Sequence, residues 1–481
     1  MSDSGGRIRF GGSRTGHRGA ERRASLSTLV FCGAIFYAPL AFGCTTPVTR
    51  FVLDGILLLG VLVFVVEQWR RGERVRLSPG LILLSAGILL VGCVSLVNDK
   101  YTFRTATDSL VENAGAIRWL PGTYDVRTSW VEIVHIFALL AALVALAVKG
   151  NQREQRWWLL GAIGIAGFVV AIIGIYQKVA GIESMLWTNK TYEDGMFFAS
   201  FRYHGNAAAF LNLSWPACLA WVFRSIEFEG KGRLVLSFWL TCLFFTFGAL
   251  VVNSSKFGHA IAIPALVLAI ILFRKGMPRL EGRMRLNGIV FGLLAAGFLL
   301  VMSLFSGSLV AELWDDAMER GVTLQYRLRA YETGWRMWCD APVWGYGAGL
   351  FGKVFPYFST GYGRDLGGSW TFAHQDYLQI LVEWGLVGGS LIFALWIWGF
   401  SGLIGQYRRS GGGSYSTAAA LLALSIVGVH AMVDFPLHIG AMQLIAVIYL
   451  SFGWCKRRRS RRKSRHSGRR RRRRDGLPAH G

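Results

Sequence analysis

The chain has 481 residues, of which 53% are hydrophobic and only 17% are charged. This composition excludes a water-soluble protein with a single core, because the long segments are apolar on every side instead of along one helix face. The net charge of +24 lies mostly in the two ends of the chain. We therefore predict an all-α, polytopic integral membrane protein.

The N-terminal segment, residues 1–25, holds six arginines against Asp3 and Glu21. We expect a basic cytoplasmic tail, since positively charged segments tend to stay on that side of a membrane. The first apolar stretch starts late and is long enough to stay in the membrane, so no cleavable signal peptide is expected.

About twelve apolar segments follow, each close to the roughly 20 residues that a helix needs to cross a bilayer. Nine of them lie within residues 26–306, and three lie within 381–455. The predicted spans are near 26–44, 51–68, 79–98, 130–148, 157–177, 206–223, 234–252, 257–273, 287–306, 381–405, 416–434 and 437–455.

The short loops alternate in their content of basic residues, and this alternation predicts the orientation. Arginine and lysine concentrate near 70–76, 149–156, 224–233, 274–285 and 408–409. The positive-inside rule assigns these loops and both chain ends to the cytoplasm. The hydrophilic loops 99–129, 178–205 and 307–380 then fall on the outer, periplasmic face. The last, between the ninth and tenth spans, is the longest, and a loop of this length is usually functional.

The C-terminal segment, residues 456–481, carries fourteen Lys and Arg residues against Asp475. Its low complexity predicts a disordered cytoplasmic tail. We expect this tail to contact anionic lipid. A nucleic-acid partner is not expected, because the run lacks the interleaved aromatic residues of such a surface.

Polar residues close to the outer ends of the spans are the candidates for chemistry. Arg202, His204 and Asn206 precede the sixth span, and Lys256 lies in the tight turn before the eighth. The remaining candidates are in the large loop and the last spans: Arg327, Arg329, His374, His430 and Asp434. His374 has two interpretations, a polar residue at a helix start or a catalytic base at the membrane surface.

Several cations and histidines at one face suit a phosphate or pyrophosphate ligand and removal of a proton from a hydroxyl. Arg202 and Lys256 could instead be interfacial anchors whose charges reach out of the membrane. The seven cysteines show no metal-ligand spacing, so we predict neither a metal site nor an obligatory disulfide. The glycine-rich stretch 345–352 follows no strand and does not fit a nucleotide loop.

Several motifs occur in an order that resembles the O-antigen ligase/polymerase family of bacterial membrane glycosyltransferases. Arg327 is followed by Tyr331 and then by Pro-Val-Trp-Gly-Tyr-Gly at 342–347. His374 opens His-Gln-Asp-Tyr-Leu-Gln, which leads to Glu-Trp-Gly-Leu-Val-Gly. The Ser-Lys-Phe-Gly turn at 255–258 and Val-His-Ala-Met-Val-Asp-Phe-Pro-Leu-His at 429–438 are also similar to family motifs. Lys256 stands where the family more often has arginine, and Gln375 where asparagine is common.

The resemblance implies that a glycan passes from a polyprenyl (undecaprenyl) pyrophosphate to an acceptor hydroxyl at the periplasmic face of the inner membrane. It implies no cofactor, no metal and no nucleotide sugar, and a place in cell-surface polysaccharide or lipopolysaccharide biosynthesis. His374 would be the base of an inverting transfer. Arg327, Lys256 and Arg202 would hold the pyrophosphate, and the substrate-binding residues would be His204, Asn206, Tyr331 and Trp370.

Three alternatives remain open from the sequence. Within the family, the acceptor is a glycolipid for a ligase, a second lipid-linked glycan for a polymerase, and a Ser or Thr of a protein for an O-oligosaccharyltransferase. A transporter or flippase would also have about twelve spans, but it predicts broken helices at mid-depth and an internal repeat, and neither is visible. A structural scaffold with a basic tail is the third class.

Overall fold

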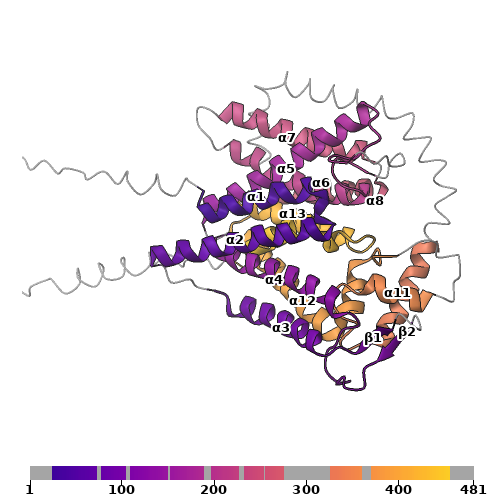
Figure 1. Cartoon of the computed structure of the whole chain (residues 1–481). Helices are drawn as coiled ribbons and strands as arrows, with labels where there is room; N and C mark the ends of the chain where they lie inside the picture. Colours follow the sequence, from indigo (N-terminus) through magenta and orange to yellow (C-terminus); the bar gives the residue numbers. More distant parts are fainter. Residues whose placement is uncertain are drawn as a thin grey trace, which may run out of the picture.

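The computed structural model describes residues 24–72, 77–104, 109–149, 152–188, 197–226, 232–253, 255–275, 325–359 and 370–454. Long helices lie side by side and form a bundle (Figure 1). The helices are α1 (Leu26–Leu40), α2 (Pro47–Arg71), α3 (Pro79–Val97), α4 (Val126–Lys149), α5 (Arg153–Val179), α6 (His204–Ser225), α7 (Gly232–Val252), α8 (Lys256–Phe273), α11 (Phe351–Ser359), α12 (Asp376–Arg409), α13 (Tyr415–His430) and α14 (Gly440–Gly453). Two short 3-10 helices, η2 (Phe42–Cys44) and η4 (Pro436–His438), precede α2 and α14.

Every predicted span coincides with a helix except 287–306, which lies outside the described residues. Within the described part of the chain, six helices are long and apolar enough to cross a membrane: α2, α3, α4, α5, α7 and α12. Helices α1, α8, α13 and α14 are apolar but shorter. A multi-pass membrane protein is therefore confirmed, whereas the count of twelve spans stays a prediction.

The centre of the bundle is formed by α6 and α13, whose side chains are buried along nearly their whole length. Runs of alanine in both helices allow neighbouring backbones to approach closely, as small residues do in membrane helices. At the periphery, only 28% of the residues in the most apolar stretch of α3 are buried inside the protein, against 61% for α5. The exposed apolar side of α3 is the surface that a bilayer would cover.

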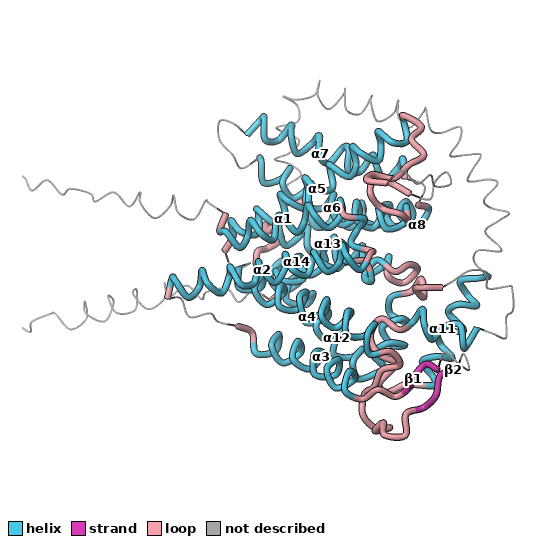
Figure 2. Tube along the Cα trace, in the orientation of Figure 1, coloured by secondary structure: helices cyan, strands magenta, loops and turns pink. Residues whose placement is uncertain are grey.

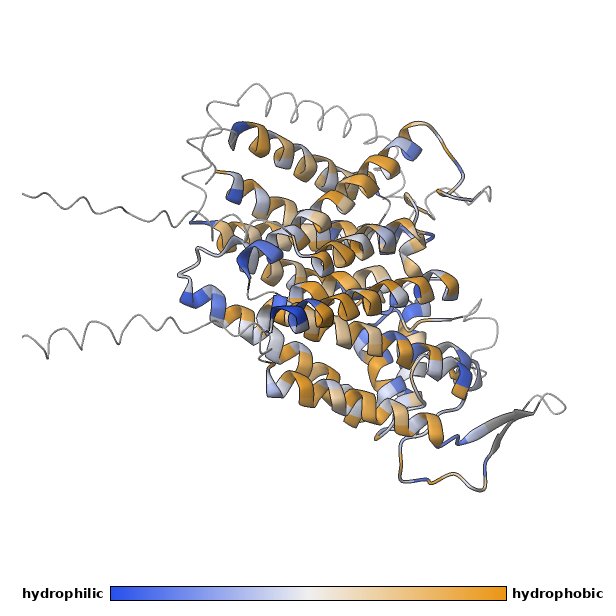
Figure 3. Cartoon of the chain, turned by 60° about the vertical axis from the view of Figure 1, so that its left-hand side comes forward, coloured by the Kyte–Doolittle hydropathy of each residue, from blue (hydrophilic) through white to orange (hydrophobic). Residues whose placement is uncertain are grey.

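The two ends of the bundle are hydrophilic, and the middle is hydrophobic (Figure 3). At one end, basic residues of the short loops pair across helices. Lys149 of α4 contacts Glu67 of α2 at 2.5 Å, and Arg224 of α6 contacts Glu154 of α5 at 2.9 Å. The described ends of α2, α4, α5 and α6 that adjoin these loops thus lie together at a single end of the bundle.

The opposite end carries the longer connections (Figure 2). They include a helix over residues 325–340, then α11, and an antiparallel hairpin of β1 (Tyr101–Arg104) and β2 (Ser109–Glu112). The sequence analysis predicted a loop at 99–129 but not this hairpin, which pairs Tyr101 with Glu112. Apart from this hairpin, the described fold is helical as predicted.

Candidate functional site

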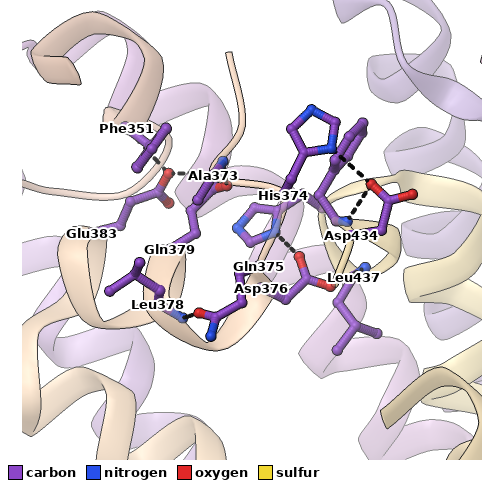
Figure 4. A network of polar contacts seen from close by, with 12 residues as sticks. Phe351, Ala373, His374, Gln375, Asp376, Leu378, Gln379, Glu383, Asp434 and Leu437 are labelled. Carbon is purple, nitrogen blue, oxygen red and sulfur yellow. Dashed lines mark hydrogen bonds and ion pairs between the residues drawn. The ribbon is translucent and has the colours of Figure 1, made fainter. Parts of the chain in front are cut away.

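His374 lies just before α12, in the connection that leaves the large loop. Its Nδ1 is 3.1 Å from Oδ1 of Asp434, which follows α13 (Figure 4). The Tyr331 hydroxyl donates a hydrogen bond of 2.9 Å to the backbone carbonyl of His374. The His374 side chain keeps 26% of its exposure, whereas Asp434 keeps only 4%. The Nδ1 edge of the imidazole is therefore held by a buried carboxylate, and the rest of the ring remains partly accessible to solvent.

Aromatic rings surround the His374 imidazole. The Phe435 ring lies edge-on with centroids 4.7 Å apart, and the Trp370 ring lies at 5.5 Å. Tyr203, just before α6, approaches at 6.5 Å. These contacts limit the rotation of the imidazole and leave a mixed aromatic and polar surface around it.

The Asp434 carboxylate serves two histidines. His430, one helical turn earlier, places Nε2 3.7 Å from Oδ2, and the Phe435 amide donates to Oδ1 at 3.1 Å. Burial by itself would raise the pKa of Asp434, but the hydrogen bond from His374 and the charges of His430 and His374 lower it well below the usual carboxyl range. Asp434 is therefore ionised at neutral pH and can stabilise a proton on His374.

Tyr203 lies between this carboxylate and a cation, because the charges of both Asp434 and Arg327 act on its hydroxyl. Burial, and then the charge of Asp434, raise the pKa of the Tyr203 hydroxyl above its usual value. The phenol stays neutral and remains a hydrogen-bond donor.

A second acid–histidine pair holds the two segments of the site together. Oδ1 of Asp376, the first residue of α12, is 2.5 Å from Nδ1 of His438 in η4. Its Oδ2 accepts from the Leu437 amide at 2.8 Å, and its own amide donates to the Ala431 carbonyl at 2.9 Å. The chain around Asp434 is thus locked to the start of α12, two residues after His374.

Arg327 joins the site from the helix at 325–340. Its Nη1 donates to the Val433 carbonyl at 3.0 Å, and its guanidinium lies 5.3 Å from the centroid of the Phe257 ring. Phe257 is the second residue of α8, so this contact brings the first turn of α8 beside Arg327. The site therefore combines the Arg327 cation, His374 and the amino-terminal turn of α8.

The predicted Lys256 is the first residue of α8, and its side chain lies outside the described atoms. Ser255 caps this helix by accepting from the Gly258 amide at 3.2 Å. Asn253 holds the preceding turn to α6, because its side chain donates to the His204 carbonyl at 3.2 Å. The helix start therefore presents its positive dipole end at the same place as Arg327.

Other predicted residues occupy the border of this cluster. His204 stacks beside Tyr203 with ring centroids 4.8 Å apart, and Asn206 is 5% exposed in the first turn of α6. The Arg202 side chain is exposed, and its guanidinium lies over the Phe42 ring at 5.9 Å. Within the described residues, Tyr203 is the residue of this segment whose hydroxyl lies close enough to feel the charge of Arg327, whereas Arg202 lies over Phe42.

The glycine-rich segment after the helix at 325–340 packs onto a break in α12. Gly385 has φ +61° and ψ −169°, a conformation essentially restricted to glycine. The freed backbone pairs with this segment, because the Leu386 amide donates to the Pro342 carbonyl at 2.8 Å and Gly347 donates to the Glu383 carbonyl at 3.0 Å. A Cβ on Gly385 would lie 2.3 Å from the Val343 oxygen. Close packing of the 342–347 segment against the break in α12 therefore accounts for the glycine at position 385.

Glu383 is a residue that the sequence analysis quoted in a motif but assigned no role. Its side chain is 3% exposed and accepts hydrogen bonds from the Gly349 amide at 2.9 Å, the Phe351 amide at 3.3 Å and the Gln379 amide nitrogen at 2.9 Å. Gln379 in turn accepts from the Ala373 amide at 3.0 Å. This chain of bonds runs from the start of α11 to the residue before His374 (Figure 4).

The sequence analysis also missed two contacts, that of Asp434 with His374 and that of Asp376 with His438. It named His430 and Asp434 as candidates in the last spans, but Asp434 lies beyond the end of α13 and also contacts His374. The only signal was the spacing of two histidines and one aspartate, His430, Asp434 and His438, within 429–438. Within the described ranges, no group of three or more His, Cys, Asp or Glu residues could hold a metal ion, and the absence of a metal stays a prediction.

Comparison with known proteins bears on the same part of the chain. The family described as O-antigen ligase matches residues 241–393, which include α8, Arg327, the glycine-rich segment and His374. No curated protein matches the chain in sequence. Residues 241–393 thus match a domain of membrane glycosyltransferase-like enzymes, and this match supports the resemblance to the O-antigen ligase/polymerase family.

Proposed function

We propose that this protein transfers a glycan from a polyprenyl pyrophosphate, such as undecaprenyl pyrophosphate, to an acceptor hydroxyl. The observation that carries the proposal is the junction of His374, Asp434 and Arg327 at one hydrophilic end of the bundle, with His374 and Arg327 inside the matched domain. An amphipathic donor has its reacting bond at that level, where lipid and water meet.

In the proposed step, the acceptor oxygen attacks the anomeric carbon of the donor glycan. The bond between that carbon and the pyrophosphate oxygen breaks, and polyprenyl pyrophosphate leaves. The proton of the acceptor hydroxyl passes to Nε2 of His374, because Nδ1 is engaged by Asp434. A single displacement inverts the anomeric configuration.

The leaving pyrophosphate needs charge stabilisation, since negative charge develops on its oxygen as the bond breaks. Arg327 and Lys256 would supply this charge together with the amino-terminal turn of α8. Arg202 would assist from the edge of the site after turning away from Phe42. No metal or cofactor takes part in this scheme.

Sugar rings would lie against the aromatic and polar side chains near His374. Trp370 and Tyr331 would stack on ring faces, and His204 and Asn206 would bind hydroxyl groups. The reacting end would face the periplasm of a bacterial inner membrane, with both chain termini in the cytoplasm. The Arg-rich segment 456–475 would then contact anionic lipids.

Reconstitution with a labelled lipid-linked glycan tests this function. Covalent transfer to an added acceptor, with release of polyprenyl pyrophosphate, is the expected result. Three acceptors separate the family activities: a lipid A-core glycolipid, a second lipid-linked glycan, and a Ser/Thr-containing protein. Movement of the lipid across the bilayer without covalent transfer would contradict the proposal and support a flippase.

A further inference from the structure

A cavity of about 150 Å³ lies at the outer-loop end of α5 and is not part of the site around His374. Its wall is formed by Gly174, Gln177, Lys178, Gly181, Ile182, Glu183, Phe197 and Phe198. We call it the Gln177 cavity. It is much larger than the roughly 10–15 Å³ that one water molecule needs on the same measure, so it can admit an organic group.

The Gln177 side chain shows an unmet demand for a hydrogen-bond donor. The residue is 6% exposed. Its amide nitrogen donates to the Ala199 carbonyl at 3.2 Å, which fixes the orientation of the side chain. Its Oε1 accepts no hydrogen bond from any described residue. A buried acceptor without a partner costs on the order of 1–3 kcal/mol, and a ligand hydroxyl in the cavity would supply the missing donor.

The other lining residues narrow the chemistry of the ligand. Lys178 offers donors and Glu183 offers acceptors at the rim, and Ile182 and Phe197 offer apolar surface. Two acceptor groups, on Gln177 and Glu183, disfavour a phosphate. An acyl chain would leave Gln177 Oε1 unpaired. Hydroxyl groups together with an apolar C–H face are the properties of an uncharged sugar ring.

The cavity is linked to His374 by a short stretch of chain. Phe198 pairs with Phe201 in a tight antiparallel bridge, and Tyr203 follows beside His374. Phe198 also packs against Gly174, where a Cβ would lie 2.0 Å from its ring. The segment that lines the cavity therefore leads directly into the candidate site.

We propose that the Gln177 cavity is a subsite for one uncharged pyranose ring of a glycan substrate. This inference rests on the proposed function, because it assigns the cavity to the glycan that the enzyme handles. The ring belongs either to the donor glycan or to the acceptor glycan. Both sources share the same chemistry, and kinetics separates them.

Saturation-transfer NMR on the purified full-length protein tests the subsite without catalysis. The probes are free glucose, galactose, mannose and N-acetylglucosamine at millimolar concentrations. We expect transfer to at least one sugar, reduced roughly tenfold in Gln177→Leu, since each lost hydrogen bond to a buried group weakens binding by about that factor. Gln152→Leu, at the opposite end of the same helix, should bind as the unmodified protein does.

Rim variants keep the test valid if Gln177→Leu fails to fold. Lys178→Met and Glu183→Gln should each weaken sugar binding several-fold, and Gln152→Leu again should not change it. No transfer to any of the four sugars, or equal transfer in the rim variants, overturns the subsite.

Steady-state kinetics identify the source of the ring. The rim variants should raise KM for the donor if the ring belongs to the donor, or for the acceptor if it belongs to the acceptor, with little change in kcat. Glycan transfer with both KM values unchanged would refute the subsite and leave the proposed function intact. Sugar binding without any glycan transfer would do the reverse.

Discussion

His374 depends on a partner that lies sixty residues away in the chain, Asp434. His374→Ala should reduce glycan transfer by about 10²-fold or more, which is the size of a general-base contribution. Asp434→Asn should give a smaller but large loss, because the amide still holds the ring but no longer stabilises its proton. Initial rates on purified, reconstituted protein measure both effects.

The control for this pair is His480→Ala, which removes a histidine near the end of the chain. Thermal unfolding of each variant shows whether the fold persists. Near-normal turnover by a well-folded His374→Ala protein would remove this histidine from the chemistry.

Lys256 and Arg327 make a separate prediction about the donor. Lys256→Gln and Arg327→Gln should each weaken donor use by roughly 10–100-fold, since a hydrogen bond to a charged group contributes about 1.5–3 kcal/mol. Lys256→Arg should keep most activity because the charge is retained. Donor and acceptor titrations at fixed protein concentration distinguish the two substrates. Unchanged donor dependence in both Gln variants would refute the pyrophosphate role.

At this scale the sequence predicted which residues come together better than how they are held. His374 and Arg327 were found from their motifs, and they share one site. The bonds of Asp434 to His374 and of Asp376 to His438 join positions about sixty residues apart. No local pattern encodes such a pairing, because it arises only when α12, α13 and the 431–440 segment pack together.

The break in α12 at Gly385 positions the glycine-rich segment 342–347, which pairs with the backbone freed there. Gly385→Ala should destabilise the protein by at least about 1–3 kcal/mol, the usual cost of a strained backbone conformation, because its Cβ would also meet the Val343 oxygen at 2.3 Å. Gly55→Ala in α2 is the matched control, since no atom lies within 4 Å of its Cβ. It should be neutral or stabilising by up to about 1 kcal/mol.

Thermal unfolding in detergent compares these two glycine variants. We expect a lower midpoint for Gly385→Ala together with loss of transfer. Equal midpoints for the two alanine variants would show that the glycine-rich segment is not held by the break.

Helices were easier to predict from the sequence than the features that interrupt or connect them. A span such as α4 is signalled by its own hydropathy, which is a local property. The break at Gly385 depends on the backbone of 342–347, and the β1–β2 hairpin depends on a pairing within a polar loop. Neither leaves a strong local pattern. The predicted span at 287–306 and the loop up to 324 lie outside the described residues.

The whole molecule has two chemically different ends, and their sides of the membrane can be measured. Cys339, which is exposed in the helix at 325–340, offers a natural reporter for the loop end. With the other cysteines replaced by alanine, Cys339 should react with an impermeant maleimide added to intact cells. A cysteine placed at Lys275, at the basic end, should react only after the membrane is opened. The reverse pattern would invert the orientation and contradict the proposed periplasmic site.

The left-handed backbone of His374 indicates that part of the protein's stability is given up to place this side chain in the candidate site. Its φ of +51° is a conformation that histidine adopts less readily than glycine does. Both His374→Gly and His374→Ala should abolish most glycan transfer. The glycine variant should unfold at a higher temperature than the alanine variant, because glycine adopts this backbone conformation without strain. Such a trade-off is common where a functional residue occupies a strained position. If the alanine variant were the more heat-stable of the two, the backbone at this point would not be under tension.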